Sequence, residues 1–284
     1  MILYKAGFGA QATDPDAPLA HSLYNCKNTI NSLVNYIREA GFTVSDVTVL
    51  LSEDGKGNFR YDVAKTQPYK GNRTKAVKPV HFDAMKEYLL ERYQSILVTG
   101  QEADDEMGIL ATRDPEKHMI ISADKDMRMI PCWHYEMGDR PPYYVDDSMG
   151  YLELDRVKGK SPKLFGTGWI WFHSQLLTGD RADHIPGIPG VGIVKAHGML
   201  KDCKNKAECV EVVAEAYKKA ELDDERLLEV SKLLWIRRER VEVPNAKTVK
   251  AMKEAESGEG LSGMVSLNEF FKEVEDDKEE EANS

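Results

Sequence analysis

The 284-residue chain lacks the features that mark membrane, secreted and zinc-binding proteins. It has no apolar run near the ~18 residues of a membrane span, and its first residues lack the basic-then-apolar pattern of a signal peptide. Its four cysteines form no CxxC pair and no zinc set with the seven scattered histidines. We therefore expect a cytoplasmic protein with reduced thiols and no membrane contact, in the host cytoplasm if the source is viral.

The glycine-rich stretch Gly187-Ile-Pro-Gly-Val-Gly192 lacks the features of a nucleotide-binding loop. No Lys-Ser or Lys-Thr follows Gly192, which excludes a P-loop, and the preceding strand and GxGxxG spacing of a dinucleotide site are missing as well. A GxPGxG turn between helices instead fits a hairpin whose exposed amides approach a phosphate, with glycines allowing close contact. A plain connector between helices is the alternative.

What the chain has is a set of seven carboxylates in four tight groups between positions 102 and 183. Like charges within ~4–6 Å raise one another's pKa, so acids gathered at the ends of elements indicate bound cations. Oxygen ligands without supporting His or Cys favour a pair of Mg²⁺ or Mn²⁺ ions over zinc. The seven residues are Glu102, Asp104, Asp105, Asp124, Asp126, Asp180 and Asp183.

The net charge of −10 is unevenly distributed. The segment 272–284 and the seven carboxylates hold more negative charge than the whole chain does, which leaves a small positive remainder. Within it, the basic stripe from Lys56 to Lys78 carries seven basic residues and one acid, Asp62. Such a stripe is typical of segments that follow a phosphate backbone, although an ordinary solvated loop remains the alternative.

The hydrophobic pattern predicts an α/β fold for the first part of the chain. Apolar residues recur at helical spacing over 26–37, and 47–51, 96–98 and 119–121 read as buried strands. A helix is expected to begin near Glu102. Strands that alternate with helices imply a parallel sheet whose ligands gather at the carboxyl ends of its strands. We therefore expect the acid groups that follow 96–98 and 119–121 to share one edge.

Four motifs occur in a fixed order over roughly residues 1 to 240 and carry a resemblance. They are Phe59-Arg60 with Tyr69-Lys-Gly-Asn-Arg73, Glu102-Ala-Asp-Asp105, Ser122-Ala-Asp-Lys-Asp126, and Gly179-Asp-Arg-Ala-Asp-His-Ile-Pro-Gly-Ile-Pro-Gly-Val-Gly192. Each alone is weak evidence. Together and in register, they make the chain similar to the 5′-nuclease family: bacteriophage 5′-3′ exonucleases, the N-terminal domain of bacterial DNA polymerase I, and flap endonucleases.

The resemblance implies a PIN-like α/β nuclease domain over residues 1–168. A helical, SAM-like DNA-binding domain with a helix-three-turn-helix hairpin would follow over 169–265, and an acidic disordered tail over 272–284. The implied activity is metal-dependent hydrolysis of DNA near 5′ ends, as a 5′-3′ exonuclease or flap endonuclease in replication or repair. RNA–DNA hybrid ends are a further implied substrate, and we expect a monomer.

The resemblance also implies roles for single residues. Two Mg²⁺ ions are expected, with Mn²⁺ as a substitute, and a K⁺ ion on the carbonyls of the hairpin. The first metal would be bound by Glu102, Asp104, Asp105 and Asp124, and the second by Asp126, Asp180 and Asp183. Asp54, or Glu53 in its place, matches a further metal-binding acid. Lys70 and Arg73 match a catalytic basic pair near the scissile phosphate, and Tyr69 an aromatic that stacks on a base. The expected DNA contacts are Tyr69, Lys70, Arg73, Gly187, Gly190, Val191, Gly192 and Lys195.

Two features of this resemblance concern the backbone around the site. The apolar residues of 82–93 recur at helical spacing, which favours a small clamp helix over single-stranded DNA. In the family, a first strand ending in a metal-binding Asp precedes a segment similar to Tyr4-Lys5-Ala6-Gly7-Phe8, before which only three residues stand here. The resemblance therefore implies that this central strand and its Asp are missing. We expect a form extended by such a strand to be more active.

Two other functions remain open. One is a structure-selective DNA-binding protein of the same fold with weak catalysis, which would bind flaps without cleaving them in Mg²⁺. The other is a PIN-type ribonuclease, against which the hairpin argues. Comparing cleavage of single-stranded RNA with cleavage of a 5′-flap duplex decides on the ribonuclease alternative.

Overall fold

The computed structural model describes residues 1–73, 77–138, 140–157 and 159–239. Residues Met1–Glu239 form one compact unit, and the boundary expected between 168 and 169 lies inside it, where β7 meets α6. Residues 240–265 of the expected helical domain and the tail 272–284 lie outside the described residues. The helices are α1 (Ile2–Thr13), α2 (Leu19–Glu39), α3 (Arg60–Val63), α4 (Phe82–Arg92), α5 (Ala103–Thr112), α6 (Gly168–Thr178), α7 (Ile193–Leu200), α8 (Lys206–Lys219) and α9 (Asp224–Leu234).

The strands confirm an α/β fold with parallel pairing, but they do not form one sheet in the described residues. β1 and β2 pair in parallel, β3 and β4 pair in parallel, and β5 joins β4 in the antiparallel sense. Two antiparallel pairs, β6–β7 and β8–β9, complete the set. The bounds are β1 (Thr48–Ser52), β2 (Gln94–Val98), β3 (Met119–Ile121), β4 (Cys132–Tyr135), β5 (Tyr143–Val145), β6 (Tyr151–Asp155), β7 (Lys163–Thr167), β8 (Gly179–Asp180) and β9 (Ile185–Pro186).

A cavity of about 1960 Å³ adjoins both β1 and β3, the two strands that lie at the edges of the separate sheets. Its other walls are apolar side chains of α2 and α5, such as Val34 and Leu110. The segment from Tyr4 to Phe8, which resembles the segment that follows the first strand in the 5′-nuclease family, lies in helix α1. That a central strand is missing stays a prediction.

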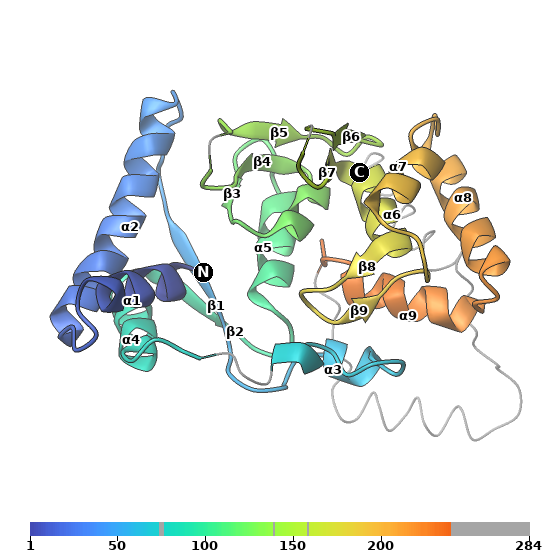
Figure 1. The fold of residues 1–284 in the computed structure, drawn as a ribbon. Coiled ribbons are helices and arrows are strands. Elements are labelled where there is room, and N and C mark those ends of the chain that lie inside the picture. Colours follow the sequence, from blue (N-terminus) through green and yellow to red (C-terminus); the bar gives the residue numbers. More distant parts are fainter. Residues whose placement is uncertain (74–76, 139, 158, 240–284) are drawn as a thin grey trace, which may run out of the picture. The chain divides into compact units, whose positions relative to one another are not determined.

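The core next to β1 is built by three helices that pack together at the blue end of the ribbon (Figure 1). Leu3 of α1, Ile30 of α2 and Leu89 of α4 share one buried cluster with Val49 and its strand neighbours. Helix α4 is therefore present where a clamp helix was expected, but its apolar face is part of the core. The spacing of that face reflects packing and not a surface for DNA.

Helix α6 is buried along nearly its whole length, including its polar residues His173, Ser174 and Gln175. It ends at Gly179, whose φ of +66° is a left-handed C-cap conformation that favours glycine. This ending turns the chain into the β8–β9 pair and so places Asp180 and Asp183. No helix in the described part of the chain is long and apolar enough to cross a membrane.

Candidate active site

A small pocket of about 120 Å³ gathers charged residues from four distant segments. Glu102 is the N-cap of α5 and Asp104 lies in its first turn. Both side chains therefore stand at the start of this helix, which follows β2. Asp124 begins the 3-10 helix Lys125–Met129, and Asp183 lies in the loop between β8 and β9. The charged and tyrosyl residues that line the pocket are Arg60, Tyr69, Lys70, Arg73, Glu102, Asp104, Asp124, Asp126 and Asp183.

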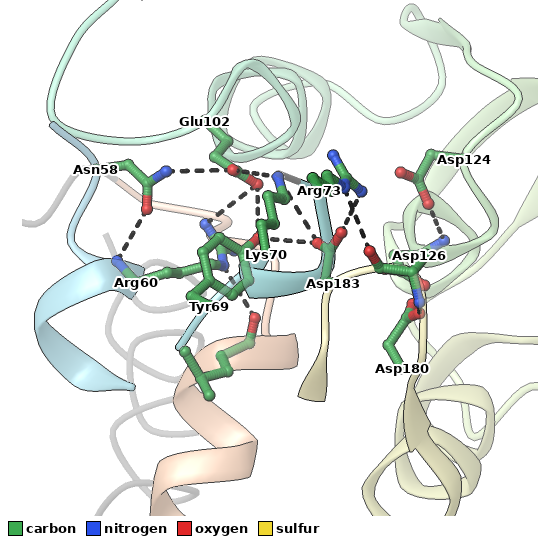
Figure 2. A network of polar contacts seen from close by, with 12 residues as sticks. Asn58, Arg60, Tyr69, Lys70, Arg73, Glu102, Asp124, Asp126, Asp180 and Asp183 are labelled. Atoms are coloured by element: carbon green, nitrogen blue, oxygen red, sulfur yellow. Dashed lines mark hydrogen bonds and ion pairs between the residues drawn. The ribbon is translucent and has the colours of Figure 1, made fainter. Parts of the chain in front are cut away.

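Glu102 and Asp183 are joined by two side chains of the Tyr69–Arg73 segment, and a third contacts Asp183 alone (Figure 2). The Tyr69 hydroxyl donates to Glu102 Oε2 at 3.0 Å and lies 2.9 Å from Asp183 Oδ2. Lys70 Nζ lies 2.5 Å from Glu102 Oε1 and 3.7 Å from Asp183 Oδ2. Arg73 forms an ion pair with Asp183 as well. The basic pair and the acids expected near a phosphate are thus in direct contact.

The position of Tyr69 differs from the expectation that it stacks on a base. Its side chain is only 4% exposed, and its ring packs edge-on against Tyr61 at 5.4 Å. A nucleotide base cannot reach the face of a ring that is buried in this way. The hydroxyl instead holds two carboxylates together, and burial followed by the charges of Glu102 and Asp183 raises the pKa of Tyr69. It therefore stays a hydrogen-bond donor.

Asp126 and Asp180 lie close together (Figure 2), and both form ion pairs with Lys125. Lys125 Nζ lies 2.6 Å from Asp180 Oδ2 and 3.1 Å from Asp126 Oδ1. Gln175 of α6 donates to Asp126. Asp124 accepts the Asp126 amide at 2.9 Å, as the side-chain cap of the 3-10 helix. Asp183, which was expected at the second metal with Asp126 and Asp180, is instead joined to Glu102 through Tyr69 and Lys70. The acids therefore divide differently from the two expected metal groups.

Three acids of the expected metal set do not line this pocket, namely Asp54, Asp105 and Asp180. Asp105 is completely buried and bound by Arg60. Asp54 lies on the surface, 2.6 Å from Lys78 and 2.9 Å from Lys86. Hydrogen bonds from these two lysines lower the pKa of Asp54. The carboxylate oxygens of Asp54 are therefore paired with Lys78 and Lys86, outside the pocket that most of the other acids line.

The crowding of carboxylates in the pocket is visible in their pKa values. Burial, with the charges of Asp124 and Glu102, raises the pKa of Asp104 to about 7. Burial also raises the pKa of Asp126 and Asp183, although neighbouring basic groups oppose it. At Asp180, burial is outweighed by Lys125, and the pKa is lowered. Such perturbation in a cleft is typical of functional sites.

The donor set fits a divalent cation that prefers oxygen, since every candidate ligand is a carboxylate. In the part of the chain that the structure describes, however, no three acidic, histidine or cysteine side chains converge closely enough to hold one ion. The acids instead form pairs with Lys70, Arg73 and Lys125. Ligation would therefore require these acidic side chains to rotate away from their basic partners.

Lys70 carries a backbone outlier. Its φ of +53° is left-handed, and so is the φ of +62° at His184, which follows its partner Asp183. The amide of Lys70 donates to the carbonyl of Asp183 at 2.9 Å, so the two strained turns are tied together. Strain of this kind, in residues other than glycine, clusters at functional sites.

Only part of the basic stripe lies on the surface of the protein. Lys56, Lys65 and Arg73 are exposed, whereas Arg60 is buried and belongs to the interior of the site. Arg60 therefore contributes to the charge of the stripe but not to its surface. The sequence motif that contains Arg60 did signal its importance, but charge counting alone could not separate a buried arginine from an exposed one.

The glycines of the expected hairpin have different structural reasons. A Cβ on Gly187 would lie 2.3 Å from the carbonyl carbon of Thr178, so this glycine is required by packing. Gly190 has a φ of +73°, and a Cβ on Gly192 would meet open space. Gly190, Gly192 and Lys195 are exposed at the start of α7, and Val191 is half-buried. Of these three glycines, only Gly192 has neither a positive φ nor a close neighbour at its Cβ position.

Two residues of the site were not singled out as functional in the sequence. Lys125 stands between Asp124 and Asp126, and its position inside that motif was an available signal. Asn58 donates to Glu102 Oε1 at 3.2 Å, and no pattern in the sequence marks it. Both become visible only when segments more than 40 residues apart are brought together.

Comparison with known proteins gives sequence relatives over most of the chain, although no family model matches it. A 5′-3′ exonuclease of Buchnera aphidicola (subsp. Schizaphis graminum) is 24% identical over 209 residues, which are 70% of this chain and 64% of the relative. DNA polymerase I of Pseudomonas aeruginosa is 36% identical over 110 residues, 37% of this chain and 11% of the polymerase. The chain thus spans less than two thirds of both relatives.

Among solved structures, the 5′-exonuclease of T5, with divalent metal ions (zinc) bound, has a similar fold. The TM-score is 0.51 at 20% identity, and the match covers 80% of this chain and 85% of the other. At 20% identity this likeness shows a similar fold. Together with the sequence relatives named 5′-3′ exonuclease and DNA polymerase I, it makes the chain similar to the 5′-nuclease family.

Proposed function

We propose that the protein is a structure-specific, divalent-metal-dependent 5′-3′ exonuclease or flap endonuclease that hydrolyses DNA phosphodiesters near 5′ ends. One observation carries the proposal: carboxylates from three separate segments line a single pocket together with Lys70 and Arg73 of a fourth. Acids alone would repel a phosphate, and basic residues alone would bind it without hydrolysis. The combination suits a reaction in which water attacks phosphorus and the bond to the leaving oxygen breaks.

The metal would be Mg²⁺, with Mn²⁺ as a substitute, held by Glu102, Asp104 and Asp124 and by Asp126, Asp180 and Asp183. When bound, two such ions activate water and offset the charge of the attacking and leaving oxygens. Asp104, with its pKa near 7, must lose its proton to ligate. Lys70 and the half-exposed Arg73 would then contact the phosphoryl oxygens, for which the guanidinium is geometrically suited.

Exposed lysines of the basic stripe and the start of α7 would hold the duplex backbone, giving recognition of shape without reading bases. A K⁺ ion on the hairpin carbonyls, RNA–DNA hybrid ends as substrates, a monomeric state and a cytoplasmic location belong to the same proposal. Salt-dependent binding of a flap duplex by the purified monomer would support the proposed contacts of the protein with the phosphate backbone of DNA.

The deciding experiment is cleavage of an end-labelled 5′-flap duplex with Mg²⁺ and with chelator, beside single-stranded RNA of the same sequence. We expect metal-dependent release of the flap and little cleavage of the RNA. Binding without cleavage in Mg²⁺ or Mn²⁺ would favour a structure-selective DNA-binding protein. Preferred cleavage of the RNA would favour a PIN-type ribonuclease.

A further inference from the structure

Asp105 has the most completely satisfied carboxylate in the neighbourhood of the pocket. Its Oδ2 accepts from Arg60 Nη1 at 2.6 Å and from the Glu102 amide at 3.1 Å. Its Oδ1 accepts from Arg60 Nη2 at 2.9 Å and from the Arg237 amide at 3.2 Å. A carboxylate offers about four lone-pair sites, and here four N–H donors use them. No lone pair is left for a metal ion.

The direction of the side chain leads to the same conclusion. Asp104 and Asp105 are consecutive in the first turn of α5, so their side chains point about 100° apart around the helix. Asp104 lines the pocket, while Asp105 faces inward and is 0% exposed. Turning Asp105 to the pocket would break both Arg60 contacts and leave the buried guanidinium unpaired, which is strongly unfavourable.

We propose that Arg60 and Asp105 are a positioning pair for the active site and that Asp105 is not a metal ligand. The inference rests on the proposed function, because it divides the expected ligand set of that site. The pair is bidentate and fully buried, a geometry that fixes both partners. It sets where helix α5 begins, and hence where Glu102 and Asp104 point.

Arg60 extends this control to a third segment. Its Nε donates to the Leu233 carbonyl at 2.9 Å, and its Nη2 to the Trp235 carbonyl at 2.8 Å. Leu233, Leu234 and Ile236 form the apolar wall of the same pocket. One guanidinium therefore joins α3, the first turn of α5 and the end of α9. Glu102 is oriented through its amide, which Asp105 accepts, and through the proximity of its Oε2 to Arg60 Nη1 at 4.0 Å.

The test compares Asp105→Asn, Arg60→Met and the double variant with Asp104→Asn as the ligand control. Mn²⁺ binding is measured by calorimetry, unfolding by circular dichroism, and flap cleavage per folded molecule at saturating Mg²⁺. We expect both single variants to unfold at a temperature on the order of 10 °C lower. Both should weaken Mn²⁺ binding equally, and less than Asp104→Asn does, because Glu102 is displaced but no ligand is removed. Both should lose kcat about tenfold or more with little change in KM for DNA, because Glu102 is misplaced.

Asp104→Asn should behave differently, with Mn²⁺ affinity reduced about tenfold or more and stability kept or raised. In the double variant, the kcat loss should be no larger than in either single variant, because both remove the same contact. Arg60→Lys keeps a charge for Asp105 and should recover part of kcat even if Arg60→Met folds poorly.

The proposal is overturned if Asp105→Asn loses Mn²⁺ affinity as Asp104→Asn does while Arg60→Met and Arg60→Lys bind Mn²⁺ normally. It is also overturned if kcat is unchanged in the Arg60 variants. Calorimetry and unfolding do not require cleavage, so an inactive wild-type protein would count against the proposed function and leave the test of the positioning pair in place.

Discussion

The ammonium of Lys70 lies 2.5 Å from Oε1 of Glu102, a residue 32 positions away in the chain. Both are about one-sixth exposed, so the contact is sheltered from water but open to the pocket. Lys70 reaches it from a left-handed backbone conformation that its own side chain disfavours. The fold thus holds a cation and an acid against each other at the place where a phosphate and a metal are proposed to meet.

Substitution of Asp124 tests the carboxylate cluster. We expect Asp124→Asn to slow flap cleavage roughly a hundredfold or more, because a charged ligand becomes neutral. DNA affinity should hold or rise, since one repulsive charge toward phosphate is removed. Cleavage rates in Mg²⁺ and binding by fluorescence anisotropy give the two readouts. Asp155→Asn, at an exposed position of β6, is the matched control. Wild-type turnover by the Asp124 variant would contradict the assignment.

Lys70 is expected to act on the rate more than on binding. Lys70→Ala should lower kcat about a hundredfold or more, with a small effect on the Kd of the duplex, because its charge is needed most as phosphoryl oxygens gain charge. Single-turnover kinetics and anisotropy separate the two effects. Lys65→Ala, at an exposed position of the same stripe, should change binding and not kcat. An equal loss of affinity in both variants with unchanged kcat would remove Lys70 from catalysis.

The start of α7 provides a separable test of DNA binding. Gly192 has φ of −101° and open space around its Cβ position, so Gly192→Ala leaves the fold intact. We expect it to weaken duplex binding by hindering approach to the amides, with kcat retained. Lys195→Ala should reduce the slope of log Kd against log salt by about 1.

Gly198→Ala in the same helix is the control, because its Cβ also meets open space. Gly187→Ala is not informative, since it would clash with Thr178 and destabilise the protein. Unchanged Kd in both the Gly192 and the Lys195 variants would show that DNA binds elsewhere.

Asp104 predicts how stability depends on pH in the absence of divalent ions. Because its pKa is raised to about 7, the folded state binds this proton more tightly than the unfolded state does. Its contribution is therefore fully favourable below pH ~4 and is lost as pH rises to ~7, by on the order of 4 kcal/mol.

The difference in unfolding free energy between wild type and Asp104→Asn isolates this effect. The buried His134 and His173, whose lowered pKa values act in the opposite direction, are common to both proteins. Denaturant titrations from pH 4 to pH 8 should show wild type losing stability relative to the variant as pH rises. A difference that does not vary with pH would mean that Asp104 titrates normally.

Local patterns were sufficient for most elements and for the membership of the acid cluster. Helical spacing over 26–37 corresponds to α2, and the apolar runs at 47–51 and 119–121 correspond to β1 and β3. These patterns can be read because each element buries one face, and burial imposes its period on the sequence. Acids placed after strands of parallel pairing then approach one another for topological reasons.

Only the tertiary structure decided which role each of two similar residues has. Arg60 and Arg73 look alike in the basic stripe, but one is buried against Asp105 and the other is half-exposed against Asp183. Asp104 and Asp105 are adjacent, but one faces the pocket and its neighbour the interior. These outcomes depend on which segments pack on either side. The contacts join residues up to 114 positions apart within the acid cluster and up to 175 at the end of α9. Burial and long-range partners are properties of the folded chain, and a local pattern of charge contains neither.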